Sequence, residues 1–429
     1  MEIRLLAYSI VILGSINLLR MAIFLIGSDI YSLLQAKRKK KLIKYLPKIS
    51  VVIPAYNEKG TILRAMRSVL GNNYPRKLLE LVVVDDGSID GTAKIVESFI
   101  KSILPNSIEH INLLVQKNSG KAAALNNGIK RFCTGELIMC LDADSFLDKK
   151  AIRNAVSYFA DSKVAALSAN IKIIKRRGLL NLVQIYEYLI CYQMKRAESL
   201  LNCEYIVGGI GSIFRRSILD KVNYYDTNTV TEDIDLTMKI LQLGNRENKV
   251  LYGSDVVAYT GSVLSIKDLL KQRYRWKWGR SQTFFKNLNM FFSPERKFSK
   301  TLSWFYLPFA IYGDMAYVIE PILLGYILAI SIYYQNFISI ISAWAVISIY
   351  VLINIFAEDT LTLKEKIKLS IGAPFMYVLF YILNFAEYVA LLKAVKNLSS
   401  LKESLNENKC EWIPVERPYG ISTKISEAA

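Results

Sequence analysis

Strongly apolar segments lie near both ends of the chain and enclose a middle part of mixed pattern. Leu5 to Ile26 is an apolar run of about the 20 residues that a helix needs to cross a bilayer. It carries no small-residue cleavage site, which predicts an uncleaved anchor. Long apolar runs return at Trp304 to Tyr334, Phe337 to Ala357 and Leu369 to Leu392. The pattern therefore predicts a multi-pass protein of the cell membrane.

A basic block after the first run sets the expected orientation. Lys37 to Lys41 belongs on the cytoplasmic side, which places the N-terminus outside and the following domain in the cytosol. Arg20 lies inside the first run, where its side chain either extends to the interface or faces other protein; we expect the former. Three further spans would leave the tail outside, yet the tail is basic over residues 393–409. Either part of residues 304–334 lies along the interface or hides two short spans, or the tail is external.

Between residues 48 and 263, short apolar runs alternate with helix-like segments. The predicted strands are 49–53, 81–84, 111–115 and 137–141, and the predicted helices are 59–70, 90–101 and 121–132. This alternation predicts βαβ units and a parallel sheet covered on both faces. Ligands bind such sheets at the carboxyl ends of the strands, where several acidic residues follow here.

Two later stretches are helical but less specific. Gly178 to Leu201 has an apolar helical stripe, and Lys267 to Lys286 is rich in basic and aromatic residues. Both suit packed helices or helices at a membrane interface. The expected division is an anchor at 1–36, a cytosolic catalytic domain at 37–264, amphipathic interface helices at 265–300, a transmembrane region at 301–395 and a polar tail at 396–429.

Composition supports the membrane assignment and narrows the chemistry. Hydrophobic residues make up 52% of the 429 residues, and the formal net charge is +18. The apolar runs make membrane lipids, rather than nucleic acid, the expected partner for this charge. The five cysteines form no CxxC pair, and the one histidine, His110, excludes a histidine-based triad or a histidine-rich metal site.

The stretch Leu141-Asp142-Ala143-Asp144-Ser145 carries the first candidate chemistry. Asp142 and Asp144 follow a predicted strand and can project to the same side. Two carboxylates at this spacing suit a hard divalent cation that holds a diphosphate. A solvated turn would explain them equally well if they stood alone.

Taken together, the motifs between residues 48 and 286 resemble those of the processive, membrane-integrated family-two glycosyltransferases, which include hyaluronan, poly-N-acetylglucosamine, chitin-oligosaccharide and cellulose synthases. The motifs that carry the resemblance are VVIPAYNE at 51–58, VVVDDGSIDGT at 82–92, NSGKAAALNNGI at 118–129, LDADS at 141–145, TED at 231–233 and QRYRW at 272–276. The resemblance implies an α/β fold of the GT-A type, a nucleotide-diphospho-sugar transferase domain, with flanking transmembrane α-helices.

The resemblance also implies roles on the donor side. Pro54, Ala55, Tyr56 and Glu58 would surround the uridine, Asp86 would accept from the uracil ring, and Lys121 would neutralise diphosphate oxygens. Asp144 would bind Mg²⁺ or Mn²⁺, with Asp142 near the ribose or the waters of the ion. From the residues alone, Asn57 could instead cap a helix and Lys121 could be a solvated first-turn residue.

On the acceptor side, Asp233 would be the general base that takes the proton of the attacking hydroxyl. Gln272, Arg275 and Trp276 would bind substrate, with Arg275 on the diphosphate and Trp276 under the acceptor sugar. The same residues also suit a helix start and an interfacial Arg/Trp anchor, and for Trp278 we expect the anchor.

The expected reaction is inverting transfer from a UDP-sugar, UDP-N-acetylglucosamine or UDP-glucose, to a growing β-linked polysaccharide at the cytoplasmic face of the membrane. The alternative is non-processive transfer of a single sugar to a membrane lipid. A transporter or a basic nucleic-acid-binding membrane protein would leave the ordered acidic motifs unexplained.

Overall fold

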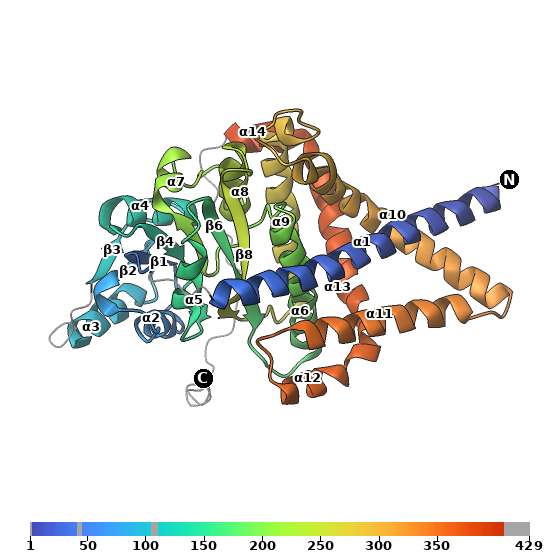
Figure 1. Ribbon diagram of the computed structural model, residues 1–429, viewed down its shortest axis with the longest axis horizontal. Helices are drawn as coiled ribbons and strands as arrows, with labels where there is room; N and C mark the ends of the chain where they lie inside the picture. The colour runs from blue at the N-terminus through green and yellow to red at the C-terminus, as the bar shows by residue number, and fades with distance from the viewer. Residues whose placement is uncertain (1, 41–44, 104–109, 407–429) are drawn as a thin grey trace.

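The computed structural model describes residues 2–40, 45–103 and 110–406 (Figure 1). The side chains of the basic block at 37–41 and the tail beyond residue 406 lie outside this description. The strands are β1 (Ile49–Ala55), β2 (Leu79–Asp85), β3 (His110–Val115), β4 (Leu137–Cys140), β5 (Phe146–Leu147), β6 (Val164–Ile173), β7 (Ser212–Arg215) and β8 (Lys249–Thr260).

All these strands form one sheet in the order β3-β2-β1-β4-β7-β6-β8-β5. β1 pairs in parallel with β2 and β4, and β2 pairs in parallel with β3. β7 is antiparallel to β4 and β6, and β5 is antiparallel to β8. The parallel arrangement predicted for the first four strands is therefore confirmed. Beyond β4 the sheet is mixed, because β6 pairs in parallel with β8 whereas β7 and β5 are antiparallel to their neighbours, and a buried strand is the same apolar run in either direction.

The parallel half positions the site. Helices α2 (Ile62–Leu70), α3 (Thr92–Ile103) and α4 (Lys121–Phe132) connect its four strands, as the alternation predicts. Along the chain, β2 and β3 are added on one side of β1, and β4 is then added on its other side. The strand order thus reverses at β1, and such a reversal opens a crevice at the carboxyl ends of the two strands that flank it, here β1 and β4. Pro54 lies within β1 rather than ending it. This costs no hydrogen bond to β4, which pairs only as far as Val52.

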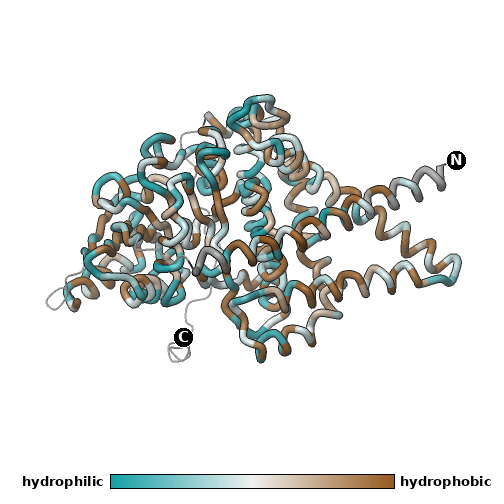
Figure 2. The backbone as a smooth tube through the Cα atoms, viewed as in Figure 1, coloured by the Kyte–Doolittle hydropathy of each residue, from teal (hydrophilic) through white to brown (hydrophobic). Residues whose placement is uncertain are grey.

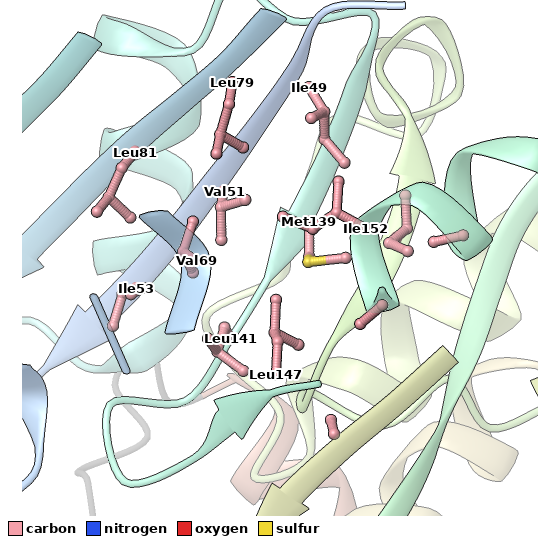
Figure 3. Packing of buried hydrophobic residues seen from close by; sticks show 14 of the residues in the cluster. Ile49, Val51, Ile53, Val69, Leu79, Leu81, Met139, Leu141, Leu147 and Ile152 are labelled. Carbon is pink, nitrogen blue, oxygen red and sulfur yellow. The ribbon is translucent and has the colours of Figure 1, made fainter. Parts of the chain in front are cut away.

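The core is apolar on both faces of the sheet. Figure 3 shows alternate residues of β1, including Val51 and Ile53, against Val69 of α2 and Met139 of β4. On the opposite face, Gly128 of α4 sits so close to the sheet that a Cβ there would lie 2.7 Å from a methyl of Val84. Apolar burial on both faces of β1 holds the loops that follow it in a rigid frame.

Of the remaining helices, α1 precedes the sheet and all the others follow β4 along the chain. They are α1 (Glu2–Lys40), α5 (Ala151–Tyr158), α6 (Leu179–Leu200), α7 (Arg216–Lys221), α8 (Glu232–Gln242), α9 (Ile266–Lys286), α10 (Leu307–Tyr333), α11 (Ile338–Ala357), α12 (Leu363–Ser370), α13 (Met376–Lys396) and α14 (Leu401–Asn406), with a π-helical turn at Thr301–Tyr306 and 3-10 turns at Arg76–Leu78, Leu288–Met290, Ala373–Phe375 and Leu398–Ser400.

The chain is a membrane protein. Four stretches in the described residues are helical, long and apolar enough to cross a bilayer: Gly14–Ala36, Thr301–Tyr333, Ile338–Ala357 and Ala373–Lys396. Figure 2 shows the apolar character of α10 and α11, which project from the catalytic domain as a hairpin. Because α10 continues unbroken from the π-helical turn to Tyr333, with Pro321 inside it, the idea of two short spans there is wrong.

The first helix packs on the catalytic domain with its second half. Phe24 and Tyr31 are buried, and Gly27 lies against Ala197 of α6, where a Cβ would come within 3.1 Å. The Tyr31 hydroxyl donates to the backbone carbonyl of Tyr252 in β8.

Two expectations about membrane-interface side chains are wrong. Arg20 faces protein: its guanidinium lies 4.9 Å from the ring of Phe309 and 3.8 Å from the sulfur of Met194. Trp278 is only 8% exposed and packs with Ala394 and Leu401. In both cases helices distant in sequence cover the side chain, which a local pattern cannot show.

Candidate active site

A cavity of about 1990 Å³ opens over the carboxyl ends of β1 and β4. Its lining includes these predicted site residues: Pro54, Tyr56, Glu58, Lys121, Asp142, Asp144, Asp233, Gln272, Arg275 and Trp276. Ala55 and Asp86 are buried and do not line it. The same cavity continues to Asn17 of α1, Tyr317 of α10 and Asn384 of α13.

Two loops on the donor side are joined to each other. Asn57 adopts a left-handed backbone conformation with φ of 55°. Its backbone N–H donates to the Ser88 hydroxyl at 2.9 Å, and its side-chain carbonyl accepts from the backbone N–H of Ile89 at 2.9 Å. Asn57 therefore links the loop after β1 to the loop after β2. It is not a helix cap, since α2 begins at Ile62 with Thr61 as its cap residue.

Asp86 organises the loop that precedes α4. Its carboxylate accepts from the side chain of Gln116 at 2.8 Å and from the backbone N–H groups of Ser119 and Gly120 at 2.9 Å each. Burial nevertheless raises the pKa of Asp86. The neighbouring Asp85 accepts from the turn amides of Gly87 and Ser88 with one oxygen. The other oxygen of Asp85 is buried without a hydrogen-bond partner.

Lys121 is the electrostatic centre of the cavity. It is the first residue of α4, and its amine lies 2.8 Å from a carboxylate oxygen of Asp142 and 2.9 Å from one of Glu232. The amine also passes over Gly209, where a Cβ would lie 2.8 Å from it. Lys121 is therefore paired with protein carboxylates, not a solvated first-turn residue, and it connects the Asp142 loop to the start of α8.

Asp142 and Asp144 supply hard oxygen ligands at the edge of the cavity. The Ser145 hydroxyl donates to the Asp144 carboxylate at 2.9 Å, and Arg64 donates to the Asp144 backbone carbonyl at 3.1 Å. No group of three acidic, histidine or cysteine ligands occurs among the described residues. Mg²⁺ and Mn²⁺ sites that act on nucleotides typically use one or two carboxylates and take their other ligands from phosphates and water, so this pair fits such an ion.

Asp233 lies in the first turn of α8, next to a glycine-rich loop at residues 208–212. One carboxylate oxygen accepts from the backbone N–H of Gly209 at 3.1 Å, and the other accepts from the N–H of Ile234 at 2.9 Å. Burial, assisted by the nearby charge of Glu232, raises the pKa of Asp233 to about 6, although Lys121 opposes the shift. A carboxylate whose pKa lies near neutrality is well suited to act as a general base.

Helix α9 forms the wall opposite the base. Gln272 is buried, and its side-chain oxygen has no hydrogen-bond partner although the residue lines the cavity. Arg275 and Trp276 line the cavity from the same helix. Gly279, one turn further on, allows α9 to approach Thr231, with which a Cβ would collide.

Sequence reasoning missed Glu232 and Arg273 as site residues. In the sequence, Glu232 is recognisable only as the residue next to the proposed base. Its contact is with Lys121, more than a hundred residues away along the chain. Arg273 lies inside the QRYRW stretch at a position to which the resemblance assigns no role, and its burial depends on helices α6 and α13.

The match to solved structures establishes the fold class. A mannosyltransferase from Pyrobaculum calidifontis, solved in complex with GDP-Man and Mn²⁺, superposes with a TM-score of 0.53 at 22% identity, covering 89% of this chain and 98% of that one. This likeness confirms the predicted GT-A fold.

Curated relatives agree in sequence over roughly three fifths of the chain. They include a poly-beta-1,6-N-acetyl-D-glucosamine synthase of Staphylococcus epidermidis, 34% identical over 63% of this chain and 62% of that protein. A synthase of the same name from Staphylococcus aureus is 30% identical over 56% of each chain. The matched region thus spans about three fifths of the length of these relatives.

Family models cover the site and extend into the C-terminal helices. The model described as "Glycosyl transferase family 2" matches residues 50–222, and that described as "Glycosyl transferase family group 2" matches residues 137–388, which is more than half of the chain. These ranges contain the Asp142–Asp144 pair, Asp233 and the QRYRW stretch. The chain belongs to glycosyl transferase family group 2.

Proposed function

We propose that this protein is an inverting glycosyltransferase that adds N-acetylglucosamine from UDP-N-acetylglucosamine to a growing β-linked glycan at the cytoplasmic face of the membrane. UDP-glucose is the second candidate donor. The names of the staphylococcal relatives support the amino sugar and the polymeric product.

The observation that carries this proposal is the length of the cavity. It begins at the loop of Tyr56, passes Lys121 and Asp233, and continues to side chains of α10 and α13 such as Tyr317 and Asn384. A single lipid-linked sugar would use only the part near the base. A cavity that extends from the base to the membrane helices suits a chain of sugars.

The reaction follows from the positions of the side chains. Asp233 accepts the proton of the acceptor hydroxyl as that oxygen attacks C1 of the donor sugar and the bond from C1 to the UDP oxygen breaks. Attack from the side opposite UDP converts an α-linked donor into a β-linked product. Arg275 contributes positive charge toward the diphosphate, and Trp276 offers an aromatic face to the acceptor sugar.

Lys121 changes partners in this scheme. In the structure it is neutralised by Asp142 and Glu232. A bound diphosphate would compete for its amine. Asp144, with Asp142 beside it, would hold a Mg²⁺ or Mn²⁺ ion, which supplies charge stabilisation for the departing UDP when bound.

The test is product analysis with defined donors. Membranes containing the protein are incubated with radiolabelled UDP-N-acetylglucosamine or UDP-glucose, and products are separated by size and by extraction into organic solvent. We expect a polymer from UDP-N-acetylglucosamine. A single lipid-extractable sugar would favour the lipid-acceptor alternative, and no transfer from either donor would refute the proposal.

We further propose that three helices cross the bilayer and that α13 lies along its surface. The Glu365 side chain of α12, before α13, pairs with Lys175 of the catalytic domain at 2.5 Å. After α13, the backbone carbonyl of Leu405 accepts from the side chain of Asn228, also in the catalytic domain, at 3.1 Å. The segments on either side of α13 thus contact the catalytic domain, and in Figure 1 α13 runs steeply across the direction of α1 and α11.

This arrangement places the catalytic domain and α14 on the same side, and the basic block at 37–41 makes that side the cytosol. With three spans the basic tail lies in the cytosol, whereas four spans would have placed it outside. Single cysteines at Gln335, in the turn between α10 and α11, and at Lys402 in α14 should be labelled from opposite sides of the membrane. Labelling of both from the same side would refute the three-span arrangement.

A further inference from the structure

Helix α9 uses opposite sides for two different sets of contacts. Arg273, Lys277 and Arg280 are spaced by four and three residues and therefore share one side of the helix. Gly279 and Gln282 lie on the other side, toward the segment that carries the base. With 3.6 residues per turn, the two sets point in roughly opposite directions.

The three cations of α9 belong to an ionic row that alternates in sign. Arg273 donates through both terminal nitrogens to Glu187 of α6, at 2.7 and 2.8 Å, and through one of them to Glu387 of α13 at 3.1 Å. Lys277 lies 2.8 Å from the second oxygen of Glu387 and 2.7 Å from Asp314 of α10. Arg280 completes the row on Asp314.

The row is electrically balanced, and two of its cations, Arg273 and Lys277, are buried. Three cations meet three carboxylates, and only 3% of the Arg273 side chain and 8% of the Lys277 side chain are exposed. A buried charge that loses its partner is costly, so a shift of α9 by one residue against α6, α10 or α13 is strongly disfavoured. The ionic row therefore fixes the register of α9 on these helices.

The opposite side of α9 is fixed on the segment of the base. Gly279 lies directly against Thr231, two residues before Asp233. The Gln282 side-chain oxygen accepts from the backbone N–H of Val230 at 3.1 Å. Any displacement of α9 would thus be transmitted to the loop that carries the base.

Arg273 also contacts the proposed acceptor platform. Its guanidinium carbon lies 4.4 Å from the ring centre of Trp276, one turn along α9, while both of its terminal nitrogens remain bonded to Glu187. The planar guanidinium held by two hydrogen bonds leaves the indole little freedom to tilt. A lysine at this position would keep the charge but would lose the fork and the flat surface.

We propose that Arg273 and the ionic row are a positioning device that holds Trp276, and through it the acceptor sugar, in register with Asp233. The proposal rests on the glycosyl-transfer function above. It assigns Arg273 no contact with the donor or with the reacting atoms. Its loss should therefore separate acceptor transfer from donor binding.

The experiment compares Arg273→Lys with Arg215→Lys in the full-length protein in membranes. Arg215 is a matched control because its guanidinium is also bonded to a carboxylate, Glu136 at 2.9 Å, and to backbone carbonyls, but it does not line the cavity. UDP affinity, sugar incorporation and UDP release to water are measured for each variant together with thermal unfolding.

For Arg273→Lys we expect unchanged UDP affinity and a fall in sugar incorporation on the order of 10- to 100-fold, as for a misplaced reactant. The ratio of UDP released to sugar incorporated should rise, and Arg215→Lys should match the parent protein. Equal behaviour of the two variants would overturn the proposal. Joint loss of UDP binding and incorporation would also overturn it, because that result indicates a general structural role.

A double variant tests whether an unpaired buried charge, rather than the loss of positioning, causes the effect. Arg273→Gln with Glu187→Gln removes one positive and one negative charge together, so neither is left buried alone. It should retain UDP binding and show the same loss of incorporation, and normal incorporation would overturn the proposal. Absence of any transfer by the parent protein would instead refute the proposed function, so the two failures are distinguishable.

Discussion

Replacement of the proposed base gives the sharpest test of the mechanism. Asp233→Asn keeps the size of the side chain but removes its ability to take a proton. Turnover should fall by about 10²- to 10⁴-fold, the usual contribution of a positioned general base. UDP should still bind, because Tyr56, Lys121 and Asp144 are unchanged.

The structure shows that this substitution also has a stability cost. Both carboxylate oxygens of Asp233 accept backbone N–H groups, one from Gly209 and one from Ile234. An asparagine has only one acceptor oxygen, so one of these amides loses its partner. A lost partner of this kind costs about 1–3 kcal/mol.

Thr237→Val provides a control with a similar local cost. The Thr237 hydroxyl accepts from the backbone N–H of Val207, in the same loop as Gly209, at 3.1 Å, and donates to the backbone carbonyl of Asp233 at 2.7 Å. Valine has the same shape and leaves that amide without its acceptor, while the carboxylate of Asp233 remains. UDP release, UDP affinity and thermal unfolding should be measured for both variants. If Asp233→Asn turns over as fast as Thr237→Val, Asp233 is not the base.

Three further predictions follow from the electrostatics of the site. Turnover should rise with pH through the pKa of Asp233, about 6, because the base must be ionised. Glu232→Gln removes a nearby negative charge and should therefore move the acid limb of the kcat/KM profile to lower pH. An acid limb that stays in place or moves to higher pH would contradict this. Excess EDTA should abolish turnover and added Mg²⁺ or Mn²⁺ should restore it, with Asp144→Asn requiring more metal; full activity in EDTA would remove the metal from the mechanism. Asp235→Asn should lower the free energy of unfolding by about 1–3 kcal/mol, because Asp235 is buried and pairs with Lys286 at 2.8 Å. UDP affinity should be unchanged. An unchanged unfolding curve would show that this ion pair does not stabilise the fold.

Local pattern predicted the parallel half of the sheet well. The helix expected at residues 121–132 is α4 to the residue, and each strand from β1 to β4 lies within a few residues of its predicted run. These elements are short, strongly patterned and bounded by glycine or acidic residues, so their ends are encoded locally. The convergence of Asp142 and Asp144 with Lys121 follows from that half alone.

The features that local pattern could not supply depend on contacts between distant segments. The antiparallel placement of β7 and the burial of Trp278 have no signature in the residues around them. The same is true of Glu232, whose role depends on its contact with Lys121, and of the direction of α13, whose length and hydropathy are those of a span. Hydropathy records how apolar a helix is and carries no information on its direction.

The packing of α1 on the catalytic domain limits which fragments of the enzyme can fold and where the domain folds during synthesis. Tyr31 bonds to the backbone of β8 and is buried against it, so a fragment that starts after residue 40 would expose an apolar face of α6 and leave polar groups of the sheet unsatisfied. During synthesis, the first helix leaves the ribosome more than two hundred residues before β8. The first helix therefore enters the bilayer before its packing partners in the catalytic domain exist. Folding of that domain is completed at the membrane surface rather than in solution.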